Sequence, residues 1–479
     1  MTDVSLGEDL RNVRKEKDLL GTRTLPANVY YGIHSVRAAE NYNFCGYPIH
    51  PELITALAMV KKASALANLE AGVLDENKAK AIVQATDEII EGKWHNQFIG
   101  EAIQGGAGTG INMNANEVIA NRALDILGHK PGNYAEIHPL DHVNKGQSTN
   151  DVVPTAIRIA AIRLMGRYLE AAELLAGTLE KKALECRDII KLGRTHLQDA
   201  VPITVGQELN AWASAIRRDV ERGHKVIELL SVVNLGGTAV GTGINADPAY
   251  MKAVGAKLRE ASGIDSLSVA PDLVDATQNL DVWVEVSGLM KATATTLTKL
   301  ANDLRLMGSG PMVGLAEVKL PAVAAGSSIM PGKVNPVIPE LINQICFKVY
   351  GNDLTIGLAA SAGQFELNVM QPVLAHCLFE SIGMLTNAMK SLAEKVIKGM
   401  EFNKQRLERY AASALSLVTA LAPIIGQDVA SDVAKKAMEE GKDIISVVIE
   451  EGLLDEATAR QVLDPRTMVA RDTDEKALA

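Results

Sequence analysis

The sequence is poor in aromatic residues and has no long apolar run. Aromatic side chains make up 4% of the 479 residues although 47% are hydrophobic, so the core must consist of Ala, Leu, Ile and Val. Ala and Leu are strong helix formers, which favours an all-α protein. No run of about 18 apolar residues could span a bilayer, and residues 1–20 lack an apolar signal core. The sequence therefore predicts a cytoplasmic protein that does not bind membranes.

Two further absences narrow the function. The formal net charge of −10 argues against nucleic acid as a partner, because phosphate binding needs a basic face. The four cysteines and nine histidines show no spacing that would hold a metal. We expect no metal site and no organic cofactor, and the sequence leaves activation by a divalent ion open. Most cysteines are expected to be buried, with Cys186 nearer the surface.

Apolar residues at helical spacing predict long helices, and several exceed 25 residues. These helices cover residues 51–92, 154–192, 205–232, 277–308, 338–361 and 372–399. Such lengths are typical of a bundle or a coiled coil, and many small residues on the helices let backbones approach closely. We expect the bundle to pack against other subunits, with a monomeric bundle as the alternative.

The last part of the chain differs from the bundle. Shorter and more charged helices are predicted at residues 403–421, 427–441, 443–452 and 455–463, so we expect a small C-terminal helical domain. Residues 470–479 are polar and are expected to fray. Strands are scarce, and only residues 201–205 indicate a short strand or an extended link.

The most informative segment is 326–336, which reads Gly-Ser-Ser-Ile-Met-Pro-Gly-Lys-Val-Asn-Pro. Pro331 prevents a regular helix and Gly332 permits unusual dihedral angles, as expected for a loop that closes over a small anion. A Walker loop is excluded, because five residues separate the two glycines and Val334 replaces the hydroxyl. A surface turn with a solvated lysine is the alternative. The groups that this loop offers to a ligand are those of Ser327, Ser328, Lys333 and Asn335.

Two other polar clusters offer possible ligand contacts. Residues 105–110 are rich in glycine and include Thr109, which indicates either a cradle for an anion or a loop that needs positive φ angles. The second cluster lies just before the helix that Pro154 is expected to open. Its residues suit helix capping, but the free N–H groups of a helix start also bind carboxylates, and both interpretations stay open. The candidate residues in this cluster are Ser148, Thr149 and Asn150.

A third cluster contains Thr195 and His196, in a break between long helices. A single histidine is more often structural than catalytic, and His142 is the rival acid–base group. The four clusters together offer hydroxyls, amides, one lysine and one histidine. This inventory suits recognition of a small dicarboxylate whose charge develops in the transition state.

These clusters make the sequence similar to the fumarase/aspartase superfamily over nearly the whole chain. The 326–336 segment resembles the superfamily signature, and further similar blocks lie at 105–109, 147–151, 193–199, 236–243 and 363–368. The resemblance implies an all-α fold of three domains: a mostly helical N-terminal domain (1–148), a central long-helix bundle (149–402) and a small helical C-terminal domain (403–479). It also implies a homotetramer with a multi-subunit helical core and active sites shared between subunits.

The 105–109 and 148–151 blocks resemble the aspartase branch, which implies reversible deamination of L-aspartate to fumarate and ammonia. Gly110 departs from the serine usual in that branch, so the choice of amine or substituted acid stays open. Fumarate hydratase, a lyase for another amino acid and a non-enzymatic scaffold are the alternatives.

The resemblance also implies roles for individual residues. Ser327 is the base, and His196, with Asn150, orients the amino group. The β-carboxylate is held by Thr109, Ser148, Thr149 and Ser328. The α-carboxylate is held by Thr195, Lys333 and Asn335.

Overall fold

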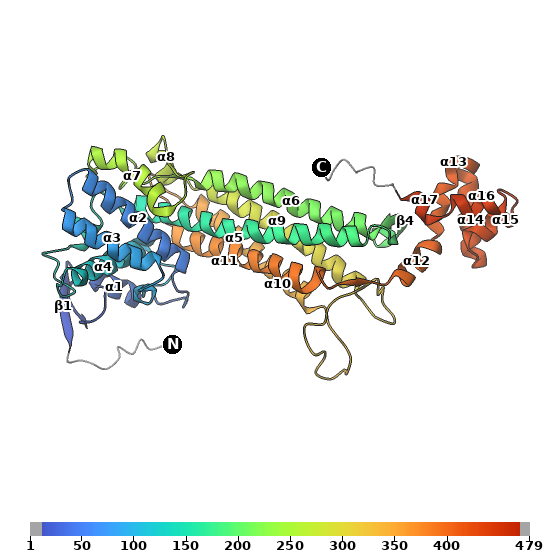
Figure 1. Cartoon of the computed structure of the whole chain (residues 1–479), viewed down its shortest axis with the longest axis horizontal. Helices are drawn as coiled ribbons and strands as arrows, with labels where there is room; N and C mark the ends of the chain where they lie inside the picture. Colours follow the sequence, from blue (N-terminus) through green and yellow to red (C-terminus); the bar gives the residue numbers. More distant parts are fainter. Residues whose placement is uncertain (1–11, 470–479) are drawn as a thin grey trace. The chain divides into compact units, whose positions relative to one another are not determined.

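The computed structural model describes residues 12–469 and is mostly helical (Figure 1). The described residues form two compact units. The first contains 12–169, 221–292 and 347–385, and the second contains 170–220, 293–346 and 386–469. Each unit therefore draws on three separate stretches of chain. The three consecutive domains expected from the sequence stay a prediction.

Five long helices contribute residues to both units. They are α5 (Thr149–Glu185), α6 (Val205–Leu230), α9 (Asp281–Met307), α10 (Val337–Ser361) and α11 (Gln371–Leu392). Polar contacts join neighbouring helices: Ser287 of α9 donates to Asp353 of α10 at 2.7 Å, and Asn352 of α10 donates to Ser381 of α11 at 3.0 Å. The long helices predicted between residues 154 and 399 are thus present, with shifted ends. The stretch predicted to be helical at 51–92 is instead divided into two helices, Pro51–Glu70 and Glu76–Ile90.

The start of α5 differs from the prediction, because the helix begins five residues before Pro154. A proline cannot donate to the carbonyl four residues earlier, here that of Asn150. The side-chain amide of Asn234 donates to this carbonyl at 2.9 Å instead. The helix can therefore include Pro154 without leaving a buried acceptor unpaired.

The first unit contains further, shorter helices. They are α1 (Ile33–Asn41), α2 (Pro51–Glu70), α3 (Glu76–Ile90), α4 (Thr109–Ile126), α7 (Pro248–Ser262) and α8 (Leu273–Gln278). Helix α2 packs against α3 and α7 and is buried on nearly all sides, as expected for a helix that is apolar all round. Its start follows from sequence: His50 accepts from the Glu52 N–H, and Pro51 occupies the first turn.

The small helices of the second unit lie near the C-terminus of the described chain. They are α12 (Lys404–Ala412), α13 (Ala422–Ile425), α14 (Gln427–Glu440), α15 (Ile444–Glu450), α16 (Glu456–Val462) and α17 (Pro465–Met468). Leu421, Val433 and Val447 belong to one buried cluster there. The helices predicted at 427–441, 443–452 and 455–463 are present. The stretch predicted at 403–421 is divided into α12 and the 3-10 helix Leu415–Ala420. Asp464 caps the additional short helix α17, and the fraying expected for 470–479 lies outside the described residues.

The strands form four two-stranded sheets. They are β1 (Val13–Asp18) with β2 (Gly21–Pro26), β3 (Ile190–Thr195) with β4 (Gln198–Thr204), β5 (Val232–Val233) with β6 (Ser268–Val269), and β7 (Val318–Lys319) with β8 (Glu401–Phe402). Residues 201–204 of the strand expected at 201–205 lie in β4, and Val205 begins α6. The sequence did not predict the other strands. Within residues 12–469, no helix has both the length and the hydropathy that a bilayer crossing requires.

The cysteines are mostly buried, as expected. Cys346 and Cys377 are buried and Cys45 is exposed. The expectation for Cys186 was wrong, since only 7% of this residue is exposed.

Candidate active site

The glycine-rich cluster forms a tight turn that leads into α4. Gly106, Ala107 and Gly108 all have positive φ angles, at 78°, 56° and 86°, so this turn does need unusual dihedral angles. Thr109 is the first residue of α4, and its hydroxyl donates to the Gly106 carbonyl at 2.7 Å. Thr109 is exposed and lines a cavity of 810 Å³ within the first unit.

Gly110 lies in the first turn of α4 and also lines this cavity. A Cβ atom at this position would meet Gln104 Oε1, and it would lie 3.0 Å from Cβ of Ala38. A side chain here would therefore point toward α1 and Gln104. The effect of Gly110 on substrate choice stays a prediction.

Ser148 caps α5 and is part of a reciprocal pair of hydrogen bonds. Its Oγ accepts from the Asn150 N–H at 3.2 Å, and its own N–H donates to Asp151 Oδ1 at 2.9 Å. Asp151 is fully buried, and its other oxygen accepts from the N–H groups of Gly236 and Thr238. Burial raises the pKa of Asp151, and these backbone donors oppose the rise. The capping interpretation is confirmed, and Ser148 still has a hydroxyl proton to donate.

A buried amide network joins the first two clusters. Asn112 Nδ2 lies 3.2 Å from Thr149 Oγ1 and 3.3 Å from Asn144 Oδ1. Lys61 Nζ donates to the same Asn144 oxygen at 2.8 Å and to Gln147 Oε1 at 3.0 Å. Sequence reasoning missed Lys61, although a lysine directly after the apolar run 56–60 was a signal.

Asn150 links the start of α5 to the glycine block at 236–243. Its Nδ2 donates to the Ala239 carbonyl at 2.7 Å. One N–H of the Asn150 side chain is thus committed to the protein, and its oxygen can act as an acceptor. Such an acceptor is suited to an ammonium group.

Thr195 and His196 lie at the tip of the β3–β4 hairpin. Thr195 pairs with Gln198, and the two turn residues, His196 and Leu197, have positive φ angles of 56° and 61°. This is the backbone of a tight two-residue hairpin turn. Both candidate side chains are exposed.

The base of this hairpin holds a buried ion cluster. Arg194 lies 2.6 Å from Glu317, and Lys191 lies 3.3 Å from Glu317 and 2.9 Å from Glu208. Glu317 is 1% exposed and immediately precedes β7, after which the segment containing Ser327 begins. The cluster therefore ties the hairpin to the start of that segment within the second unit.

The 326–336 segment is a loop between β7 and α10 (Figure 1). Ser327 Oγ accepts from the N–H groups of Ile329 and Met330, both at 3.3 Å. Gly326 has a φ of 103°, and a Cβ there would lie 2.9 Å from the Lys333 carbonyl oxygen. Glycine thus permits the close approach of the two sides of the loop. Ser328, Lys333 and Asn335 are exposed.

The candidate residues fall into two sets. Hydrogen bonds connect the segments of Thr109, Ser148, Thr149 and Asn150 within the first unit. The other set belongs to the second unit and consists of Thr195, His196, Ser327, Ser328, Lys333 and Asn335.

The rival histidine has structural partners. His142 Nδ1 accepts from the His138 N–H at 2.8 Å, and Nε2 lies 3.3 Å from Lys78 Nζ. Burial, together with Lys78, lowers the pKa of His142. Across residues 12–469, His, Cys, Asp and Glu side chains form no group of three or more that could hold a metal ion.

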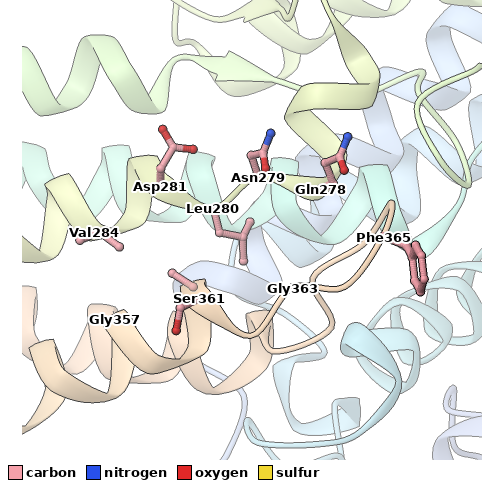
Figure 2. Close-up of a pocket in the computed structure, with 10 residues that line it drawn as sticks. Gln278, Asn279, Leu280, Asp281, Val284, Gly357, Ser361, Gly363 and Phe365 are labelled. Carbon is pink, nitrogen blue, oxygen red and sulfur yellow. The ribbon is translucent and has the colours of Figure 1, made fainter.

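The block at 363–368 borders a separate pocket of 410 Å³ (Figure 2). Asn279, Asp281 and Ser361 supply polar groups to it, and Phe365 lies at its edge. Asn368 donates to the Ala359 carbonyl at 2.9 Å, so the end of α10 is capped beside the pocket. None of the ten candidate residues lines it.

Comparison with known proteins places the chain in a family. A family described as lyase matches residues 21–351, and one described as fumarase C C-terminus matches residues 417–470. The chain belongs to the fumarase/aspartase lyase family. The resemblance drawn from the sequence blocks is therefore confirmed, and a lyase-family enzyme replaces the scaffold alternative.

Individual members of this lyase family are similar over almost their full length. An aspartate ammonia-lyase from Bacillus sp is 51% identical over 95% of this chain and 97% of its own. The crystal structure of fumarate lyase:delta crystallin from Brucella melitensis is 47% identical, with a TM-score of 0.93 over 95% of this chain and 99% of that one. The class II fumarase from Schistosoma mansoni is 34% identical, with a TM-score of 0.92 over the same shares. The predicted fold class is thus confirmed.

Proposed function

We propose that the protein is an aspartate ammonia-lyase, which converts L-aspartate to fumarate and ammonia and catalyses the reverse addition. The observation that carries this proposal is the 51% identity to an aspartate ammonia-lyase over 95% of the chain. Identity to the class II fumarase is 34% over the same share of the chain. The cytoplasmic location predicted from the sequence stays a prediction.

In the proposed reaction, ionised Ser327 removes a proton from the β-carbon of aspartate. The electron pair of the broken C–H bond moves into the β-carboxylate, which becomes a doubly charged aci-carboxylate. This pair then forms the double bond while the bond from the α-carbon to nitrogen breaks, and ammonia leaves. Hydroxyl donors are needed where the additional charge develops.

The geometry of Ser327 supports its role as the base. A serine hydroxyl is a weak base unless its alkoxide is stabilised. The two N–H groups that lie 3.3 Å from Ser327 Oγ would stabilise that charge, more strongly once closure of the loop excludes water. The positive φ angles of Gly326 and Gly332 suit them to serve as the hinges of closure.

The proposed carboxylate contacts follow from the charge and donors of each side chain. Ser148, Thr149, Thr109 and Ser328 would bind the β-carboxylate. Lys333 supplies the cation for the α-carboxylate, with Asn335 and Thr195 as neutral donors. The free Asn150 oxygen and the exposed His196 ring would orient the amino group.

We further propose a homotetramer whose active sites combine residues of different subunits. Helix α10 carries a face of large apolar side chains that the single chain leaves exposed. Phe347, Leu354 and Leu358 of the first unit are 61%, 65% and 64% exposed, at helical spacing on one face. Covering such a face with helices of another subunit would remove apolar area from water.

The decisive experiment is Ser327→Ala, with fumarate followed by its absorbance. We expect kcat on L-aspartate to fall by about a thousandfold or more, because the base is lost. Val323→Ala is the matched control, since Val323 is exposed in the same stretch of chain, and it should retain activity. A variant with a substantial share of wild-type kcat would remove Ser327 from this role.

A substrate panel tests the alternatives. Malate turnover without dependence on ammonia would favour fumarate hydratase. Poor turnover of aspartate with good turnover of a larger amino acid would favour a lyase for another amine, a result for which Gly110 would be the first residue to examine.

A further inference from the structure

Lys61 is a charged side chain in an unusual place. It lies in the middle of α2, none of its surface is exposed, and its neighbours Met59 and Val60 are also buried. Lysine is almost never fully buried unless it is paired. Within residues 12–469, however, no carboxylate lies within ion-pair distance of Lys61.

The ammonium group is instead held by neutral amides. Its two acceptors are Asn144 Oδ1 and Gln147 Oε1. Asp151 of α5 is the charged group that acts on Lys61 at longer range, and burial lowers the pKa of Lys61 to about 7 against that attraction. The phenol of Tyr250 on α7 is also buried, and burial and then Asp151 raise its pKa.

A short chain of hydrogen bonds leads from Lys61 to a candidate substrate residue. Asn144 Oδ1 accepts from Lys61 and also from Asn112 and Asn116. Asn112 Nδ2 in turn lies 3.2 Å from Thr149 Oγ1. Since Thr149 Oγ1 accepts from the protein, its hydroxyl proton is free to point toward a ligand.

Fold stability alone does not explain why the buried position 61 in α2 carries a cation. Removing an ammonium from water is costly, and replacing a buried charge by an apolar side chain of similar size is often neutral or stabilising. A methionine would fill the same space on α2. The charge is better explained by what it orders: the side-chain amides of Asn144, Gln147 and Asn112, whose oxygen and nitrogen ends must point in defined directions.

We propose that Lys61 is a positioning residue that, through Asn144 and Asn112, fixes Thr149 with its hydroxyl proton directed at the substrate carboxylate. This inference rests on the proposed function, because it assigns Thr149 to carboxylate binding. It predicts that loss of Lys61 damages the reaction only through Thr149.

A double-mutant cycle tests this coupling, with kcat and KM for L-aspartate measured on the full-length protein. We expect Lys61→Met and Thr149→Val each to lower kcat/KM by about 30-fold, and the double variant to be no worse than Thr149→Val alone. Lys62→Met is the matched control, because Lys62 is the adjacent residue but pairs with Asp87 at 2.6 Å. It should stay within about twofold of wild type. Losses that multiply in the double variant would overturn the proposal.

Hydrogen exchange gives a second readout that needs no turnover. Lys61→Met should accelerate exchange of amides in 144–152, where the N–H groups of Gln147, Ser148 and Val152 are hydrogen-bonded, and should leave α3 and α7 unchanged. Acceleration throughout the first unit, or none at 144–152, would overturn the inference. If wild type forms no fumarate from aspartate, the proposed function fails, while this exchange pattern still decides the role of Lys61.

Discussion

At the scale of the residue, the candidate hydroxyls differ in what they can still donate. Ser148 Oγ and Thr149 Oγ1 accept hydrogen bonds from the protein, so their protons are available to a ligand. The Thr109 proton is already used, because this hydroxyl donates to the Gly106 carbonyl. A substrate must break that bond before Thr109 can donate to it.

This difference predicts unequal effects of two matched substitutions. Thr149→Val should lower kcat/KM for L-aspartate more than Thr109→Val, by about tenfold between the two, since a donor that must first leave a carbonyl contributes less net free energy. Steady-state kinetics with both purified variants measures the ratio. Equal losses, or a larger loss for Thr109→Val, would contradict this ranking of the two hydroxyls.

His34 provides a residue-scale prediction for pH. Its Nδ1 lies 3.0 Å from Glu117, which is 1% exposed, and this hydrogen bond raises the pKa of His34 despite partial burial. A raised pKa in the folded state adds stability that is complete below the unfolded value of about 6.5. This stability is lost as the pH rises through the folded pKa.

The variant His34→Gln should therefore be less stable than wild type in acid by about 1 kcal/mol or less, because His34 is partly exposed and solvent screens the pair. Urea unfolding midpoints of both proteins, measured at pH values from about 5.5 to 8.5, should converge as the pH rises. If the difference between the two unfolding midpoints stayed constant or widened as the pH rose, the His34–Glu117 pair could not be its source.

At the scale of the element, the long helices could be predicted from periodicity, but most of the short strands could not. Strand β1 reads Val-Arg-Lys-Glu-Lys-Asp and lacks the apolar alternation of a half-buried strand. The β3–β4 turn consists of His196 and Leu197, neither of which is the glycine or asparagine usual at positive φ. Apart from the 201–205 run, which indicated part of β4, the two hairpins therefore carry no local sequence signal.

The start of α5 shows a different limit of sequence reasoning. Pro154 was expected in the first turn because proline usually stands there. The structure instead pairs the freed carbonyl of Asn150 with Asn234, a residue distant in sequence. Periodicity and capping rules use only neighbouring residues, so they cannot predict a helix end that is fixed by a contact with a distant residue.

The ion cluster at the base of the β3–β4 hairpin carries a prediction at this scale. Glu317→Gln should destabilise the protein by about 3 kcal/mol, since it leaves the buried Lys191 and the half-buried Arg194 without their shared anion. Glu208→Gln is the matched control, because Glu208 also contacts Lys191 but its side chain is 22% exposed. Thermal unfolding should give a clearly lower midpoint for Glu317→Gln. Equal midpoints would mean that the buried carboxylate does not hold this hairpin.

At the scale of the whole molecule, the sequence could identify candidate residues but could not predict which of them lie close together. Family blocks identified Thr109, Thr149, His196 and Ser327 without any reference to space. The network that connects Lys61 to Thr149 could not be predicted from the sequence, because its members come from three separate segments of chain. The proposed homotetramer cannot be predicted from local sequence either, because each active site would combine candidate residues of the first unit and candidate residues of the second unit from different subunits.

Shared active sites predict recovery of activity in mixed tetramers. Thr149→Val and Ser327→Ala remove groups from different sets, and each homotetramer should be nearly inactive. Both chains are co-expressed with different affinity tags and purified through both tags. In the mixed tetramers, a site is complete only if its Thr149 comes from a Ser327→Ala chain and its Ser327 comes from a Thr149→Val chain. Random assembly meets both conditions in about a quarter of sites, so the mixture should reach about a quarter of wild-type activity. A mixture no more active than either homotetramer would mean that one chain supplies both groups. The proposal of shared sites would then be wrong, while the assignment of the two residues could stand.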